Sequence, residues 1–279
     1  MLNYFPSTET LLVSQELMYD KNSLIIIITL FILMLIINQI AYTLGRRNKD
    51  VENAEMKTQS TAIQTGIIGL LALLLGFTFN MSLHRYDARS SAVIEEAGAI
   101  NRVAMQAKLL PIEIREAVFS ELEVYLTLRI SLSQVDLSNP EQRSNINKKV
   151  NKSQANLIEL AQKELVNPKS LLIANGFYQS LSSMIQIENK RTAMLRLHVP
   201  EPVLFLLFGV FVTVGGMLGY NSGLGKKRPA FPTILLFTLI VLVVFIIIDL
   251  DRPKRGIIQV NQDSLHDATV TLQDYKAGS

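Results

Sequence analysis

Four long apolar runs restrict the fold of this 279-residue chain more than any other feature of its sequence. Each run is long enough to cross roughly 30 Å of hydrocarbon as a helix. None of them contains Lys, Arg, Asp or Glu. Buried helices of soluble proteins usually keep a polar stripe, which these runs lack. We therefore predict transmembrane helices at Leu24–Leu44, Ala62–Leu83, Val203–Tyr220 and Phe231–Ile248.

The spacing of these runs predicts the domain organisation. A polar stretch separates the second and third runs, and it has helical periodicity without any strand pattern. The predicted fold class is all-α: a polytopic membrane protein with four transmembrane helices and an extramembrane helical bundle between spans two and three. The parts are an N-terminal tail at 1–23, spans one and two at 24–83, the bundle at 84–199, spans three and four at 200–249, and a C-terminal tail at 250–279.

No proline interrupts the chain from Ala62 to the residue before Pro111. This segment begins as apolar sequence and runs directly into charged sequence. We predict one continuous helix, Ala62–Leu110, that begins in the bilayer and ends in water. At about 1.5 Å per residue it would be roughly 70 Å long and would couple the membrane to the bundle.

Prolines mark the predicted helix starts inside the bundle. Pro111 opens one helix. Asn139–Pro140 joins an N-cap to a proline at the start of another, and Asn167–Pro168 is predicted to repeat this device. The last helix is predicted at about Lys169–Leu197. The expected arrangement is an antiparallel four-helix bundle whose first and last helices connect to spans two and three.

Small residues recur along span two at alternating steps of three and four, so they share one helix face. Two interpretations remain open: the face packs against a helix of the same subunit, or it lines a pore around an oligomer axis. In the second case Phe77 and Phe79 would form an apolar constriction. In span three Gly209, Thr213 and Gly216 are predicted to pack against span two. The face consists of Ala62, Gly66, Gly69, Leu73, Gly76 and Asn80.

A charged block follows span two, and two aspartates close span four. These groups either form interhelical or intersubunit salt bridges, or they form a vestibule that concentrates ions. A carboxylate at the membrane boundary is costly without a partner, so arginines of the block are predicted to accompany the aspartates. The candidate residues are Arg85, Asp87, Arg89, Glu95, Glu96, Asp249 and Asp251, with Arg85 or Arg89 as the predicted partner of the two aspartates.

The chain contains no cysteine, and its three histidines lack zinc-site spacing. Nucleotide-binding glycine loops and nucleophile elbows are also missing from the sequence. We therefore expect no enzyme, no catalytic residue, no cofactor and no bound metal. The small net charge of +3 gathers near the membrane ends. The expected partners are the lipid bilayer, further copies of the chain and inorganic ions, but not nucleic acid.

Four spans place both termini and the bundle on one side of the membrane and the short loops on the other. The short loops are basic, through Arg46, Arg47, Lys49, Lys57, Lys226, Lys227 and Arg228. This pattern favours an inner (plasma) membrane protein with cytoplasmic short loops and with termini and bundle on the opposite side. Other membrane-proximal basic residues favour the reverse: Arg85, Arg89, Lys190, Arg191, Arg196, Arg252, Lys254 and Arg255.

Two segments resemble the bestrophin-like family of four-span prokaryotic and plant membrane proteins. They are LLGFTFNMSLHRYDARSSAVIEEAGAI, followed by Leu109–Pro111, and IIIDLDRPKRGIIQV at Ile246–Val260. Spans and helical segment match in the same order, so the resemblance covers nearly the whole chain. A more distant resemblance to true bestrophins implies a homo-oligomer, a pentamer that conducts anions, with the helical part in the cytoplasm. No acidic calcium clasp of the bestrophin kind is recognisable.

The predicted function is therefore an oligomeric integral membrane protein with an ion channel-like pore lined by span two. The alternative is a non-conducting membrane sensor or scaffold whose helical domain binds a partner.

Overall fold

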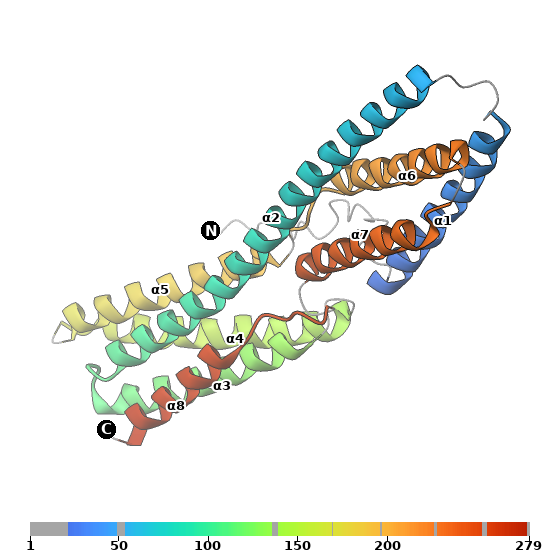
Figure 1. The fold of residues 1–279 in the computed structure, drawn as a ribbon. Coiled ribbons are helices and arrows are strands. Elements are labelled where there is room, and N and C mark those ends of the chain that lie inside the picture. The colour runs from blue at the N-terminus through green and yellow to red at the C-terminus, as the bar shows by residue number, and fades with distance from the viewer. Residues whose placement is uncertain are drawn as a thin grey trace, which may run out of the picture. The chain divides into compact units, whose positions relative to one another are not determined.

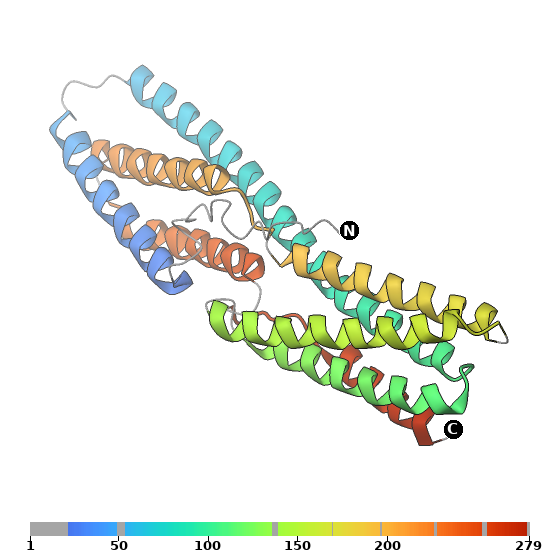
Figure 2. The same cartoon turned by 180° about the vertical axis from the view of Figure 1, so that it is seen from behind.

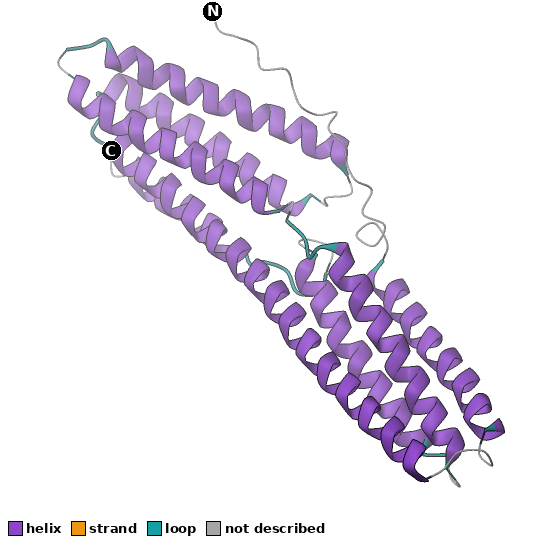
Figure 3. Ribbon diagram, turned by 90° about the horizontal axis from the view of Figure 1, so that it is seen from above, coloured by secondary structure: helices purple, strands orange, loops and turns teal. Residues whose placement is uncertain are grey.

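The structure, a computed structural model, describes residues 22–48, 54–135, 139–168, 170–195, 197–225, 228–252 and 256–277. Regular secondary structure in these ranges is helical throughout (Figure 3). The described residues form two compact units, a membrane unit within 1–82 and 199–252 and a helical unit within 83–198 and 253–279. The predicted N-terminal tail up to residue 21 lies outside the described residues, as do Lys49, Arg196, Lys226, Lys227, Lys254 and Arg255.

In the described part of the chain, four helices are long and apolar enough to cross a membrane. They are α1 (Ser23–Arg47), α2 (Ala54–Ala107), α6 (Glu201–Leu224) and α7 (Ala230–Asp251). The predicted all-α fold with four spans is thus confirmed. Helix α1 packs against both α6 and α7 (Figures 1 and 2). Their apolar side chains form one core, in which Met34, Phe211 and Phe237 are fully buried.

Helix α6 approaches α1 so closely that glycine is required at the contact. A Cβ atom on Gly219 would overlap the carbonyl oxygen of Asn38. One on Gly223 would overlap the carbonyl oxygen of Tyr42. The buried Asn38 side chain donates from Nδ2 to the carbonyl of Gly215 at 3.0 Å. Small residues four apart thus bring the two backbones together, and a buried polar side chain joins them.

The predicted contact of Gly209, Thr213 and Gly216 with span two is wrong. Thr213 is exposed, and among the described residues no other helix comes within 4 Å of a Cβ built on Gly209. A Cβ on Gly216 would instead meet Ile37 of α1 at 3.4 Å. The physical reason is that α1 packs against the side of α6 that carries Gly219 and Gly223. Gly209 and Thr213 lie roughly a quarter of a turn away from that side around the helix.

Polar side chains, not glycines, join α2 to α6. The hydroxyl of Ser60 donates to Oδ1 of Asn221 at 2.7 Å, and the Asn221 amide donates to Oε1 of Gln64. These bonds hold α2 near its first turns in the membrane unit. Both hydrogen bonds are formed within one chain, so they do not depend on a second subunit.

Helix α2 is continuous over 54 residues, which confirms the prediction of one uninterrupted helix through the membrane boundary. At 1.5 Å per residue it is about 80 Å long. It starts eight residues before Ala62 and ends three residues before Leu110. Its second half enters the helical unit and buries Ile100, Val103 and Ala107 there.

The helical unit combines that half of α2 with α3 (Ile112–Gln134), α4 (Pro140–Leu165) and α5 (Leu171–Met194), as predicted. The predicted cap of α4 is confirmed, because Oδ1 of Asn139 accepts from the Gln142 N–H at 3.1 Å. The predicted cap at Asn167–Pro168 is wrong. Helix α5 begins only after Ser170, whose hydroxyl donates to Oε2 of Glu164 at 2.5 Å instead of capping the helix.

A further helix, α8 (Asp263–Ala277), lies within the segment that the sequence analysis set apart as a C-terminal tail. It packs against α3 and buries Leu265, Ala268 and Leu272 in the core of the helical unit. Lys276 also pairs with Glu123 of α3 at 2.9 Å. The chain after the last span therefore returns to the helical unit and helps to close it.

Candidate functional site

The small-residue face of α2 points away from the other described helices of the membrane unit. All six of its residues are exposed: Ala62, Gly66, Gly69, Leu73, Gly76 and Asn80. The buried residues of this stretch, Leu71, Thr78 and Ser82, lie about 180° away around the helix. The small-residue face and the buried residues of α2 therefore lie on opposite sides of the helix.

The three glycines of this face meet nothing in the described chain. No atom lies within 4 Å of a Cβ built on Gly66, Gly69 or Gly76. This differs sharply from Gly219 and Gly223 of α6, which pack against backbone. The interpretation that the α2 face serves packing inside one subunit is therefore unsupported by the described residues.

Helix α2 is also the least covered of the four spans. Within its most apolar 18-residue stretch only 11% of residues are buried, compared with 22% in α1 and 33% in each of α6 and α7. A span with many small and polar residues is thus left largely uncovered by the described residues.

The two phenylalanines of the predicted constriction flank this open face. Phe77 is 63% exposed and Phe79 is 36% exposed. At 100° per residue they stand about 60° and 100° from its centre, on opposite sides. Neither is needed for the core of the membrane unit.

In the helical unit Glu96 is completely buried in a four-residue ion-pair network. Its Oε1 accepts from Nε of Arg129 at 2.5 Å, and its Oε2 accepts from Nη1 of Arg191. Arg129 also reaches Oε1 of Glu188 at 2.8 Å. Three helices, α2, α3 and α5, each supply charges to this cluster. The negative charges of two carboxylates thus balance the positive charges of two guanidinium groups away from water.

The network keeps Glu96 ionised. Burial raises the pKa of its carboxyl group, but the guanidiniums of Arg129 and Arg191 outweigh that effect and hold the pKa below its ordinary value. Burial likewise lowers the pKa of Arg129, and the charge of Glu96 more than reverses this. A buried ion pair of this kind is stable only while every partner is present.

The remaining charged candidates have different surroundings. Glu95 forms an exposed pair with Lys190 at 2.9 Å, Asp87 is exposed and Arg85 is half-buried. Arg89 is buried and donates to the main-chain carbonyl of Leu197 at 2.7 Å.

Both aspartates at the end of α7 are buried. The carboxylate of Asp251 accepts from the Val199 N–H at 3.0 Å and so ties the start of α6 to the end of α7. The pairing of Asp249 and Asp251 with Arg85 or Arg89 stays a prediction. Within the described residues no group of three or more His, Asp and Glu side chains lies close enough to hold a metal ion.

Sequence reasoning missed the partners of Glu96. Arg129 stands on the buried stripe of α3 with Leu122, Tyr125 and Leu132, so a lone charge on an apolar helical face was the available signal. Such a charge needs a buried counter-ion, but the sequence does not say which one.

Comparison with known proteins agrees with this architecture. The family model of the Bestrophin-like domain matches residues 31–265. A crystal structure of a bacterial bestrophin homologue from Klebsiella pneumoniae, carrying a point mutation, superposes with a TM-score of 0.62. The match covers 88% of this chain and 98% of that one at 14% identity, which shows a shared fold. A search of curated protein sequences found no match. Because the family model covers most of the sequence, the chain belongs to the Bestrophin-like family.

Proposed function

We propose that this chain assembles with copies of itself into an ion channel-like pore, lined by the Ala62–Asn80 face of α2. The observation that carries the proposal is the open side of α2. Surfaces that face lipid are built from large apolar side chains, whereas small residues and a terminal asparagine suit contact with another helix or with water. A pore formed by several copies of α2 meets both requirements.

The half of α2 that belongs to the helical unit also exposes apolar side chains. Ile94 is 60% exposed and Met105 is 49% exposed. Large apolar side chains exposed on a helix outside the membrane segment favour coverage by a neighbouring subunit. The bestrophin-like family, whose characterised members are oligomeric ion channels, supports the same proposal. We expect five copies in the assembly, the number that the resemblance to true bestrophins implies.

Within such a pore the two phenylalanines act as an apolar constriction, and glycines around them leave room for ions. Neither Phe77 nor Phe79 belongs to the apolar core of the membrane unit, so a role at the axis does not compete with packing there. A ring of such side chains can close a narrow pore by excluding water.

A cysteine at Gly76 tests the pore directly. The chain has no native cysteine, so a charged thiol reagent would modify only the introduced residue. In liposomes carrying an ion gradient, we expect flux through unmodified protein and a several-fold drop when Gly76→Cys is labelled. Thr78→Cys, on the buried side of the same helix, is the matched control and should keep its flux. Silence of the wild-type protein with chloride, potassium and sodium would instead support the sensor or scaffold.

We further propose that the protein lies in the inner (plasma) membrane with its short loops in the cytoplasm. Reporter fusions at Asn48 and after Ser279 test this topology. The charge pattern predicts a cytoplasmic signal at Asn48 and a signal from the opposite side at Ser279. The reversed pair of signals would contradict the charge argument and agree with the orientation that the resemblance to true bestrophins implies.

A further inference from the structure

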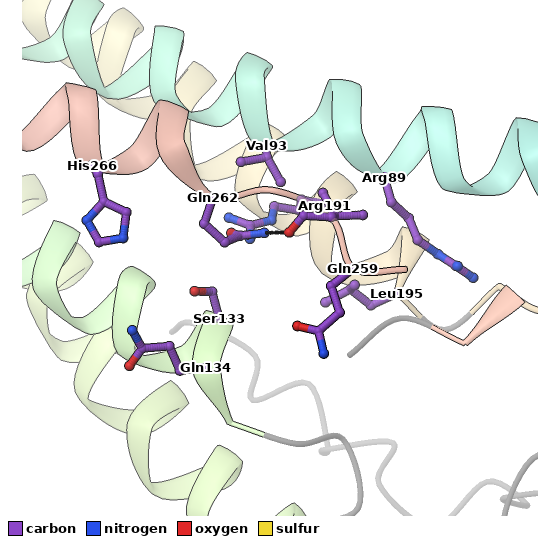
Figure 4. A pocket seen from close by; sticks show the side chains of 10 residues that line it. Arg89, Val93, Ser133, Gln134, Arg191, Leu195, Gln259, Gln262 and His266 are labelled. Atoms are coloured by element: carbon purple, nitrogen blue, oxygen red, sulfur yellow. Dashed lines mark hydrogen bonds between the residues drawn. The ribbon is translucent and has the colours of Figure 1, made fainter. Parts of the chain in front are cut away.

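The helical unit contains a cavity of about 400 Å³ that the pore proposal does not use. The ends of α3 and α5 surround it, together with α2 and the segment that leads into α8 (Figure 4). Its volume lies in the range of small-molecule sites. All of its lining residues belong to the helical unit.

The described part of the lining is rich in hydrogen-bond donors and contains no acidic residue. Its ten described residues comprise two arginines, three glutamines, one serine, one histidine and three aliphatic residues. Guanidinium groups donate only, and carboxamides and imidazole can also donate. The complementary ligand therefore carries oxygen acceptors and a negative charge.

The central arginine of the cavity is held in place before any ligand arrives. Arg191 is buried and donates to Glu96 and, at 2.7 Å, to Oε1 of Gln262. Gln262 in turn donates to the main-chain carbonyl of Val260 at 2.9 Å. These bonds use two of the five N–H donors of the Arg191 guanidinium, so donors are left for a further acceptor.

Two polar side chains from different helices line the cavity. His266 projects from α8 and Ser133 from the last turn of α3 (Figure 4). The Ser133 hydroxyl donates to the carbonyl of Ile130 at 2.6 Å. Val93 and Leu195 contribute apolar side chains to the lining, and a bare inorganic ion would offer them no apolar contact. A ligand that satisfies both kinds of surface has an anionic head and an aliphatic body.

We infer that this cavity binds a small organic anion, a carboxylate with a short aliphatic body, whose charged contact is the guanidinium of Arg191. The site joins α2 to the end of α5 and to the chain that returns after the last span. It is independent of the proposed pore, since binding is measurable in a protein that does not conduct.

Protection of introduced cysteines from a maleimide reagent tests this site in the purified full-length protein. His266→Cys and Ser133→Cys each place a thiol in the cavity lining, one on α8 and one on α3, in a chain that has no other cysteine. Two reporters are used so that a loss of binding caused by one substitution does not hide the site. Asp267→Cys is the control, because Asp267 is exposed on the same helix and does not line the cavity.

The probes are hexanoate, its neutral analogue hexanamide and inorganic phosphate. Hexanoate at ten times its Kd should slow labelling of at least one cavity cysteine about tenfold and leave Asp267→Cys unchanged. Hexanamide and phosphate should protect much less. Equal protection by phosphate would overturn the organic part of the inference, and equal protection by hexanamide would overturn the anionic part. Absence of protection of both cavity cysteines by hexanoate overturns the site itself.

Discussion

Replacing Glu96 by glutamine is expected to lower the free energy of unfolding of the helical unit by about 3–5 kcal/mol, the usual cost of breaking a buried ion pair from one side. The substitution keeps the shape of the side chain but removes the charge that Arg129 and Arg191 share. Of the two carboxylates that the described network contains, Glu188 alone would then remain for two buried guanidiniums. Urea unfolding of the detergent-solubilised protein, followed by circular dichroism, measures the change.

The neighbouring glutamate supplies a matched control. Glu95→Gln breaks an exposed pair with Lys190 one position earlier on the same helix, and its expected cost is within about 1 kcal/mol. If both substitutions cost the same, burial of the Glu96 network does not matter for stability. A second check is the double variant Glu96→Gln with Arg129→Gln, which should lose less than the sum of the single losses. Strict additivity would contradict the direct pairing of these side chains.

The same network predicts how stability depends on pH. The pKa of Glu96 is lower in the folded protein than its unfolded value of about 4.3, so the folded protein binds its proton less readily. The contribution of Glu96 is therefore fully present above that unfolded value and is lost as pH falls through the lower folded pKa. Wild-type protein should lose stability in this acidic window more steeply than Glu96→Gln.

Replacing Gly219 by alanine is expected to disrupt the contact between α1 and α6 and to destabilise the membrane unit by at least about 1–3 kcal/mol. The added Cβ would overlap the carbonyl oxygen of Asn38, which belongs to a helix backbone and cannot turn aside. The helices would have to separate, which also weakens the bond from Asn38 to Gly215. Thermal unfolding and the yield of monodisperse protein measure the effect.

Gly209→Ala on the same helix is the matched control. No other described helix comes within 4 Å of its Cβ position, and alanine is the better helix former, so the stability should stay level or rise slightly. A loss at Gly209 equal to that at Gly219 would show that the helix itself, not its contact with α1, needs glycine. The comparison thus separates helix propensity from interhelical packing.

The contrast between the two glycine rows shows where sequence reasoning stops. Alternating small residues on α2 and glycines four apart on α6 both predict close helix contacts. Only the structure shows that Gly219 meets the backbone of α1, while Gly76 meets no other helix among the described residues. Whether a small residue has a neighbour depends on distant parts of the chain, so a local pattern cannot supply the answer.

The buried charges give a second example. Helical spacing puts Glu96 near the side of Arg89 and away from Glu95, and in the structure Glu96 and Arg89 are buried while Glu95 is exposed. Its partner Arg129 comes from a helix 33 residues further on and had not been singled out. A charged residue on an otherwise apolar helix face indicates that a buried partner exists. It does not indicate which residue that partner is.

The sequence by itself determined the four spans, the all-helical fold and the uninterrupted helix α2, because hydrophobic length, helical period and the absence of proline act locally along the chain. The tertiary structure decided which glycines touch a neighbour, which charges meet in the Glu96 network and that α8 returns to α3. It also decided that Arg191 and His266 face one cavity. These features join residues far apart in the chain, and their geometry exists only once the helices have packed.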